Sequence, residues 1–243
     1  MSTLVFDIET VGESWDAFDD VTKTSLTRWV DRTAVDREQR EAHLLDLKDG
    51  LGFSPLTGRI VSIGLYDVER AQGVVFYDTK GTEDTEVDTG EYVLKPRTEA
   101  AMLRDFWEGA KSYDTFVTFN GRGFDVPFLL LRSMALGITP TRDLMEGRYL
   151  YQQRTAQHID LQDQLSFYGA LPRRHSLHLF CRACGMVSPK QEVSGDDVAT
   201  LYQEEKYQDI ARYNAKDVVA TTELYLRWKE TIAPRGLREI EGS

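Results

Sequence analysis

The sequence predicts one α/β domain, in which helices flank a mixed β-sheet and a helical insert follows the first strand. Three patterns carry this prediction: a short apolar run at residues 3–8, a pair of β-prone runs at 59–67 and 73–78, and a long helical pattern at about 206–230. With 243 residues, 41% of them hydrophobic, the chain can bury a sizeable core. We find no linker that would divide it, so we treat residues 1–243 as a single domain.

The first half of the chain begins with the run at 3–8, which is apolar and β-prone and therefore predicts a buried strand. Residues 13–50 are charged and predict inserted helices. Their apolar residues recur at roughly helical spacing: Trp15, Phe18, Leu26, Trp29, Val30, Leu44, Leu45 and Leu47. The segment 52–58 contains Pro55 and is expected to be a loop. The runs at 59–67 and 73–78 then predict a hairpin.

The second half is expected to be mainly helical around one further strand. Residues 80–90 are acidic and rich in Thr and Gly, which predicts a loop, and 98–111 show helical spacing. The run 114–119 predicts a buried strand, and 126–136 an apolar helix that tolerates Pro127 in its first turn. After residue 155 the pattern is mostly helical. This order favours a mixed sheet over a regular βαβ alternation.

Composition limits the class of protein. No window has the roughly 18 apolar residues that a membrane span needs, and the N-terminus lacks the basic region of a signal peptide. The chain has two cysteines, Cys181 and Cys184, so a cytoplasmic location without disulfides is expected. The net charge of −11 argues against a broad basic surface for nucleic acid. It is compatible with a site where acids hold metal ions and the metals attract phosphate.

The first candidate motif is Asp7-Ile8-Glu9-Thr10, at the end of the first predicted strand. Alternate residues of a strand point to the same face, so Asp7 and Glu9 are expected to project together. Two nearby carboxylates repel each other unless a cation lies between them. An acidic strand end that turns into a loop is the plainer alternative.

The second motif runs from Thr118 to Phe128, between a predicted strand and a predicted helix. Gly121 and Gly123 allow tight backbone geometry and close approach by a ligand. Asp125 falls at the N-cap or in the first turn of the helix, so it can be a helix cap, a metal ligand or both.

The third motif lies on the last predicted helix, where Asp217 follows Tyr213 by four residues on an apolar stripe. A buried carboxylate needs compensation, and a metal ion or an arginine from another element can supply it. Tyr213 alone would pass as an ordinary core residue.

Together these motifs, D-x-E at 7–9, N-x3-F-D at 120–125 and Y-x3-D at 213–217, resemble those of the DEDD superfamily of 3′–5′ exonucleases. The histidine branch of that superfamily has His five residues before the last Asp, where this chain has Arg212, so the resemblance is to the tyrosine branch. It is similar in particular to stand-alone proteins related to the exonuclease domain of family-B DNA polymerases. The resemblance extends from residue 3 to about 230, with the segment 13–50 its least typical part, and implies a ribonuclease-H-like fold.

The resemblance implies hydrolysis with two Mg²⁺ or Mn²⁺ ions held by Asp7, Glu9, Asp125 and Asp217, and release of nucleoside 5′-monophosphates from a 3′ end. Oxygen ligands suit such hard cations. Asp7 would bridge both ions, and Tyr213 would orient the attacking water, since an unperturbed phenol with a pKa of about 10 is a poor base. The expected substrate is single-stranded nucleic acid, with DNA favoured over RNA.

Further residues are candidates for substrate contacts. Thr10 is expected at the terminal nucleotide, and Asn120 and Phe124 along the path of the strand, with core packing the alternative for Phe124. Candidate phosphate contacts, each of which can also be ordinary surface, are Arg122, Arg173, Arg174, Lys190 and Lys216.

Two other features have structural interpretations. The Cys181-x-x-Cys184 pair is expected to pack in the core, because a structural zinc needs four ligands; a mixed site with His175 and His178 is the alternative. His158-Ile-Asp160 is interpreted as architectural, with a place at the edge of the site as the alternative.

Three functions compete with a DNA exonuclease. The first is a 3′–5′ exoribonuclease, because nothing in the sequence reads the 2′-hydroxyl. The second is a nucleic-acid-binding module of the same fold that does not cut, although such a module needs no acid cluster. The third is an interaction protein whose insert at 13–50 docks a partner.

Overall fold

The structure is a computed structural model that describes residues 2–82, 84–188 and 197–234. Within this part of the chain, seven strands form one mixed sheet in the order β4-β5-β3-β2-β1-β6-β7. The strands are β1 (Thr3–Gly12), β2 (Gly58–Asp67), β3 (Gln72–Tyr77), β4 (Val87–Asp88), β5 (Tyr92–Pro96), β6 (Thr115–Thr118) and β7 (Gln157–Asp160). Strand β1 pairs antiparallel with β2 and parallel with β6, so the predicted mixed sheet is confirmed.

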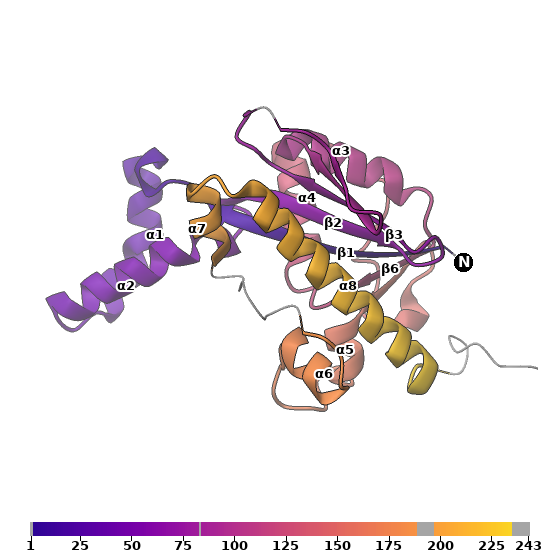
Figure 1. The fold of residues 1–243 in the computed structure, drawn as a ribbon. Helices are drawn as coiled ribbons and strands as arrows, with labels where there is room; N and C mark the ends of the chain where they lie inside the picture. The colour runs from indigo at the N-terminus through magenta and orange to yellow at the C-terminus, as the bar shows by residue number, and fades with distance from the viewer. Residues whose placement is uncertain (1, 83, 189–196, 235–243) are drawn as a thin grey trace, which may run out of the picture.

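Helices cover both faces of this sheet (Figure 1). The long helix α8 (Tyr207–Thr231) crosses one face over β1, β2 and β3, and α3 (Glu99–Ala110) and α4 (Asp125–Ala135) pack on the other. The remaining α-helices are α5 (Leu161–Leu165), α6 (Leu177–Ala183) and α7 (Val198–Gln203), and short 3-10 turns lie at Trp15–Ala17, Gly50–Phe53 and Leu150–Gln152. None of the helices in the described part of the chain is long and apolar enough to cross a bilayer.

The insert predicted at 13–50 is helical. It consists of α1 (Asp20–Thr33) and α2 (Arg37–Asp49), which pack against each other and project away from the sheet (Figure 1). Asp19 and Asp36 cap the two helices by accepting hydrogen bonds from Thr22 and Gln39. The turn at Gly50–Phe53 contacts β1 and β2, so the insert joins the body beside the end of β1.

Four sequence predictions of secondary structure need correction, and one of them is the segment after residue 155, which begins with strand β7 instead of a helix. The first strand continues to Gly12, so Asp7 and Glu9 lie inside it rather than at its end. The predicted loop at 80–90 contains β4, and β5 was not predicted. Strand β4 is the edge strand and pairs with β5, which in turn pairs with β3, so pairing with a neighbour rather than a long apolar pattern stabilises these two short strands.

The sheet separates two apolar cores. Leu4, Phe6 and Ile8 of β1 pack into the core under α3 and α4, whereas Val5 and Val11 belong to the clusters under α8. Because side chains alternate along a strand, the residues between Val5 and Val11 that share their face are Asp7 and Glu9. The same alternation that builds the core therefore directs both acids toward α8.

Candidate active site

Asp7 and Glu9 lie beyond the last β1 residue that pairs with β6, which is Val5 opposite Val117. On the other side of β1 they face Gly64 and Ser62 of β2, and the register of this pair shifts just after Glu9. The two acids therefore lie where the sheet opens between β1 and β6, near the carboxyl ends of parallel strands. This is the edge at which open α/β sheets bind their ligands.

Helix α8 brings the third acid to this place. Carboxylate oxygens of Asp7, Glu9 and Asp217 all lie within 4.8 Å of one another. Glu9 is buried, whereas Asp7 and Asp217 are half-buried. Tyr213, one turn before Asp217, is buried and hydrogen-bonds to the Asp217 carboxylate. The structure thus brings together residues from the first and last of the three motifs.

Asp125 is the first residue of α4, and the N-cap position belongs to Phe124. The sequence predicted that Asp125 lies either at the N-cap or in the first turn of the helix. The structure confirms the first turn. The Asp125 side chain is buried, and its Oδ1 accepts a hydrogen bond of 3.1 Å from the backbone N–H of Ile8, so it ties α4 to β1. It lies outside the three-carboxylate cluster but within electrostatic range of Asp7 and Asp217.

The protonation of these groups reflects their crowding. Burial, followed by the neighbouring Asp125, Glu9 and Asp217 carboxylates, raises the pKa of Asp7 well above its usual value. Burial raises the pKa of Asp125 to about 7. Burial and the adjacent Asp217 also raise the pKa of Tyr213, so its phenol stays protonated at neutral pH. These carboxylates repel one another when they are ionised, and a hard divalent cation, which prefers oxygen ligands, would offset that repulsion.

Asn214 completes the cluster and was not singled out from the sequence. Its fully buried side chain donates a 2.7 Å hydrogen bond to Asp7 Oδ2 and accepts one of 3.1 Å from Ser62 Oγ. Gly64, opposite Asp7 in the sheet, gives it room, because a Cβ there would lie 2.5 Å from Asn214 Oδ1. The signal available in the sequence was a polar residue beside Tyr213 and three residues before Asp217 on an otherwise apolar helix face.

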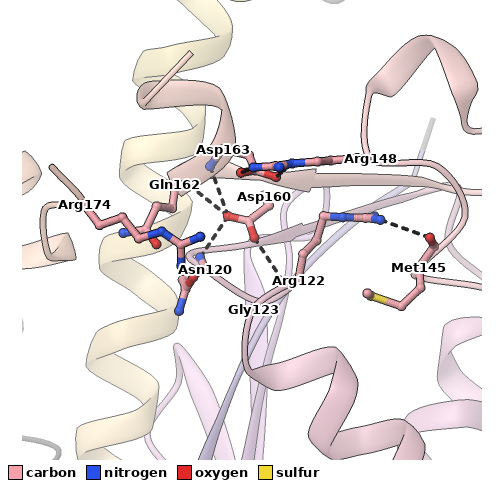
Figure 2. Close-up of a pocket in the computed structure, with 9 residues that line it drawn as sticks. All are labelled: Asn120, Arg122, Gly123, Met145, Arg148, Asp160, Gln162, Asp163 and Arg174. Atoms are coloured by element: carbon pink, nitrogen blue, oxygen red, sulfur yellow. Dashed lines mark hydrogen bonds and ion pairs between the residues drawn. The ribbon is translucent and has the colours of Figure 1, made fainter. Parts of the chain in front are cut away.

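Two neighbouring cavities lie beside the cluster. The larger, of about 440 Å³, is lined by Asp7, Asp217 and the segment 174–178, among others. The smaller, of about 240 Å³, is bounded by Gly123, Asp160 and Arg148 (Figure 2). Asn120, Gln162 and Arg174 line both cavities and so form their common wall.

The residues predicted to contact substrate occupy different surroundings. The Thr10 hydroxyl donates a 2.7 Å hydrogen bond to the Gly52 carbonyl, which holds the turn after the insert. Phe124 packs against Phe128 and the core under α4, as the core alternative states. Arg122 lines the smaller cavity, but its guanidinium donates to the carbonyls of Leu144 and Met145 at 3.2 and 3.0 Å.

The remaining basic candidates for phosphate contacts differ in their position relative to the two cavities. Arg174 lines both cavities, whereas Arg173 is absent from the lining of either one. Lys216 is exposed on α8 and lines neither cavity. Lys190 lies outside the residues that the structure describes.

His158 and Asp160 hold the second motif in place, as the architectural interpretation expects, and Asp160 also lines the smaller cavity, as the alternative expects. His158 is buried between the Leu144 carbonyl and the Thr118 hydroxyl, and burial lowers its pKa to about 4. The Asp160 carboxylate accepts 2.9 Å hydrogen bonds from the backbone N–H groups of Asn120 and Arg122. Asn120 has a φ of 65°, a left-handed conformation that this anchor stabilises.

The cysteines show no metal site in the described part of the chain. Cys181 is buried in α6, and Cys184 follows the end of that helix. Among the described residues, the one group of His, Cys, Asp and Glu side chains close enough to hold a metal ion is Asp7, Glu9 and Asp217. Cys181 is fully buried, and Cys184 packs as a partly buried neighbour against a cluster under α8, which agrees with the expected core packing.

Comparisons with known proteins relate this chain to DNA polymerases. The chain is 24% identical over 214 residues to the catalytic polypeptide of DNA polymerase epsilon from Emericella nidulans, and the match covers 86% of this chain and 9% of that protein. It is 28% identical over 145 residues to a DNA polymerase of Desulfurococcus, covering 55% of this chain and 18% of the other. This chain thus spans less than a fifth of these relatives.

A solved family B DNA polymerase from the archaeon Pyrobaculum calidifontis shares the fold. Its TM-score is 0.55 at 18% identity, over 93% of this chain and 24% of the polymerase. A family described as a predicted 3′–5′ exonuclease related to the exonuclease domain of PolB matches residues 57–234, which include Asp125, Tyr213 and Asp217. Because this match covers most of the sequence, the chain belongs to that family of predicted 3′–5′ exonucleases.

Proposed function

We propose that this chain is a metal-dependent exonuclease of the tyrosine branch that shortens single-stranded nucleic acid from the 3′ end, with DNA preferred over RNA. The observation that carries the proposal is the cluster of Asp7, Glu9 and Asp217 within 4.8 Å, with Tyr213 hydrogen-bonded to Asp217. A module that only binds nucleic acid has no need to bury such mutually repelling acids. The preference for DNA rests on the relatives, which are DNA polymerases.

The residues fit two divalent cations, Mg²⁺ or Mn²⁺. Asp7, Glu9 and Asp217 would hold one, and Asp7 with Asp125 the other. When bound, such a pair activates water and stabilises the attacking and leaving oxygens of a phosphodiester displacement. Asn214 fixes Asp7 in the orientation that both sets share, because its amide donates to Asp7 Oδ2.

Tyr213 orients the attacking water. Its hydroxyl proton is directed at Asp217, which leaves the lone pairs of the phenol oxygen to accept a hydrogen bond from water. Because its pKa is raised, the phenol does not act as the base at neutral pH. Water would attack the phosphorus in line with the P–O3′ bond, which breaks and leaves a 3′-hydroxyl on the shortened strand. The phosphate stays on the 5′ oxygen of the released nucleotide, so the product would be a nucleoside 5′-monophosphate.

The test is digestion of 5′-labelled single-stranded DNA and of the matching RNA with Mg²⁺, Mn²⁺ or EDTA. Wild type is compared with Asp7→Ala and with Asp46→Ala, which removes an exposed acid of α2 in the insert. We expect a metal-dependent ladder that shortens from the 3′ end in the wild type and in Asp46→Ala, and none in Asp7→Ala. If RNA is cleaved faster than DNA, RNA becomes the preferred substrate of the proposed exonuclease. Absence of cleavage of both strands would favour the binding module, and cleavage by Asp7→Ala would mean that the site is misplaced.

A further inference from the structure

Arg174, which lines both cavities, is an arginine whose guanidinium has no hydrogen-bond or ion-pair partner among the described residues. Three arginines line the smaller cavity: Arg122, Arg148 and Arg174 (Figure 2). Arg148 forms a two-pronged ion pair with Asp163 at 2.7 and 3.1 Å, and Arg122 donates to two backbone carbonyls. Arg174 makes no hydrogen bond or ion pair with any residue in the ranges 2–82, 84–188 and 197–234. Its donors therefore remain available to a ligand.

The backbone around Arg174 is held in place even though its side chain is not. Gln162 Nε2 donates a 2.9 Å hydrogen bond to the carbonyl of His175, the next residue. Gln162 itself follows β7, and its backbone N–H donates to the buried Asp160 carboxylate. The segment that carries Arg174 is thus tied to the same anchor that holds Asn120. Figure 2 shows the Arg174 side chain extending toward Asn120.

Position on the common wall determines what Arg174 can bind. The acids that would act on the scissile phosphate, Asp7 and Asp217, line the larger cavity alone. Arg174 lines both, so a group bound to it lies between the catalytic cavity and its neighbour. Arg174 is also the one Lys or Arg residue in the lining of the larger cavity. A guanidinium presents planar paired donors that match a phosphate, and one such contact offsets the repulsion between a strand and these acids.

We propose that Arg174 binds the phosphodiester next to the scissile one, the second linkage from the 3′ end, and that the smaller cavity receives the nucleotide behind it. This assignment rests on the proposed exonuclease function. It makes Arg174 a substrate-binding residue that recognises a strand rather than a single nucleotide. The strand would pass from the acids, over Asn120 and Arg174, toward Gly123.

The first arm of the test uses kinetics with the full chain. Arg174→Gln is compared with Arg173→Gln, which removes the same charge from the neighbouring residue outside both cavities. On a single-stranded oligonucleotide we expect Arg174→Gln to lower kcat/KM about tenfold, mainly through KM, since a hydrogen bond to a charged group is lost. Arg173→Gln should match the wild type. Hydrolysis of thymidine 5′-monophosphate p-nitrophenyl ester, which has one phosphodiester, should be equal in all three proteins.

The second arm locates the contact. One oligonucleotide carries a neutral methylphosphonate at the second linkage from the 3′ end, and another carries it at the fifth. The second-linkage probe should lower the initial rate of the wild type by about the factor that Arg174→Gln does, and should not lower the rate of Arg174→Gln further. The fifth-linkage probe should leave the effect of the mutation unchanged.

Three results would overturn the assignment. Equal losses on the ester and on the oligonucleotide would place Arg174 at the scissile phosphate. If Arg174→Gln and the second-linkage methylphosphonate together lower the initial rate by the product of their separate factors, the two changes act independently and Arg174 does not bind that linkage. Identical behaviour of Arg174→Gln and Arg173→Gln would make Arg174 an ordinary surface residue. Because Arg174 has no partner among the described residues, its replacement should leave the thermal midpoint unchanged, which excludes misfolding as the cause.

A third arm separates this assignment from the proposed function. If the wild type hydrolyses none of these substrates, the exonuclease proposal fails, and Arg174 is then judged by fluorescence anisotropy with the unmodified oligonucleotide in EDTA. Arg174→Gln should bind the strand about tenfold more weakly than Arg173→Gln, and its dependence of log Kd on log salt should be shallower by about 0.7. Equal affinities of the two variants would overturn the assignment.

Discussion

The side-chain amide of Asn214 donates a 2.7 Å hydrogen bond to Oδ2 of Asp7, across 207 residues of sequence. Asn214 is fully buried on α8, and Asp7 lies on β1, so this bond sets the orientation of the carboxylate that the proposed mechanism places between both cations. Partners of this kind orient metal ligands, and their loss typically lowers metal affinity or activity by about 10- to 100-fold.

Replacing Asn214 by Ala should therefore raise the Mg²⁺ concentration needed for half-maximal exonuclease activity by about tenfold or more. The matched control is Thr222→Ala on the same helix, whose buried hydroxyl donates to the Val218 carbonyl within α8. Both variants should lose stability, and Asn214→Ala alone should change the metal requirement. An identical Mg²⁺ titration of the two variants would show that Asn214 has no part in orienting Asp7.

Gly64 allows α8 to approach the sheet at this point. A Cβ on Gly64 would lie 2.5 Å from Asn214 Oδ1 and 2.7 Å from Val218 Cγ2. Gly64→Ala should lower the free energy of unfolding by about 1–3 kcal/mol, as overpacking does, and should lower activity because α8 carries Tyr213 and Asp217. Gly109→Ala is the control, since a Cβ there meets nothing within 4 Å in helix α3 and should stabilise by about 0.5–1 kcal/mol. Chemical denaturation measures both, and wild-type stability of Gly64→Ala would contradict the close approach.

The raised pKa of Asp125 makes stability depend on pH when no metal is bound. Its pKa is about 7 in the folded chain and about 3.9 in an unfolded one, so the folded state holds a proton that the unfolded state has released between these values. Stability from this group is therefore fully present below about pH 4 and is lost as pH rises toward 7. Asp7 contributes with the same sign, because its pKa is raised as well.

His158 has the opposite effect, since its pKa falls to about 4 in the folded chain and stability from it rises with pH above that value. The measurement is therefore a difference between wild type and Asp125→Asn, in which the contribution of His158 cancels. In EDTA, the wild type should lose more free energy of unfolding than Asp125→Asn on going from pH 5 to pH 8. Saturating Mg²⁺ should narrow this difference, because a cation stabilises the ionised carboxylate. A difference that does not vary with pH would contradict the raised pKa of Asp125.

Tyr213→Phe separates the orientation of water from proton abstraction. Loss of the hydroxyl should lower kcat about 100-fold, the effect of a misplaced reacting group, while Tyr225→Phe on the same helix should leave kcat unchanged. The loss should be the same factor at every pH from 6 to 9, because the raised pKa keeps the phenol protonated throughout. A loss that grows with pH would instead indicate a phenolate base.

The local patterns of the sequence determined much of this protein. Alternation along a strand was enough to place Asp7 and Glu9 on one face, and helical spacing was enough to put Tyr213 and Asp217 one turn apart, because both relationships depend on residues close in sequence. The apolar periodicities likewise identified the insert, the hairpin and the last helix. Short strands such as β4 and β5 have too few residues to show a periodicity, so their formation depends on pairing with a neighbouring strand.

Only the tertiary structure decided what meets at the site. The choice of Asn214 as the partner of Asp7, and of Ile8 as the partner of Asp125 across 117 residues, depends on which sheet face each helix covers. The same holds for three arginines that the sequence could not distinguish as phosphate contacts. Arg122 donates hydrogen bonds to backbone carbonyls, Arg173 lies outside both cavities, and Arg174 lines both. Local spacing fixes the direction of a side chain relative to its own element, whereas its partners come from packing between elements that are distant in the chain.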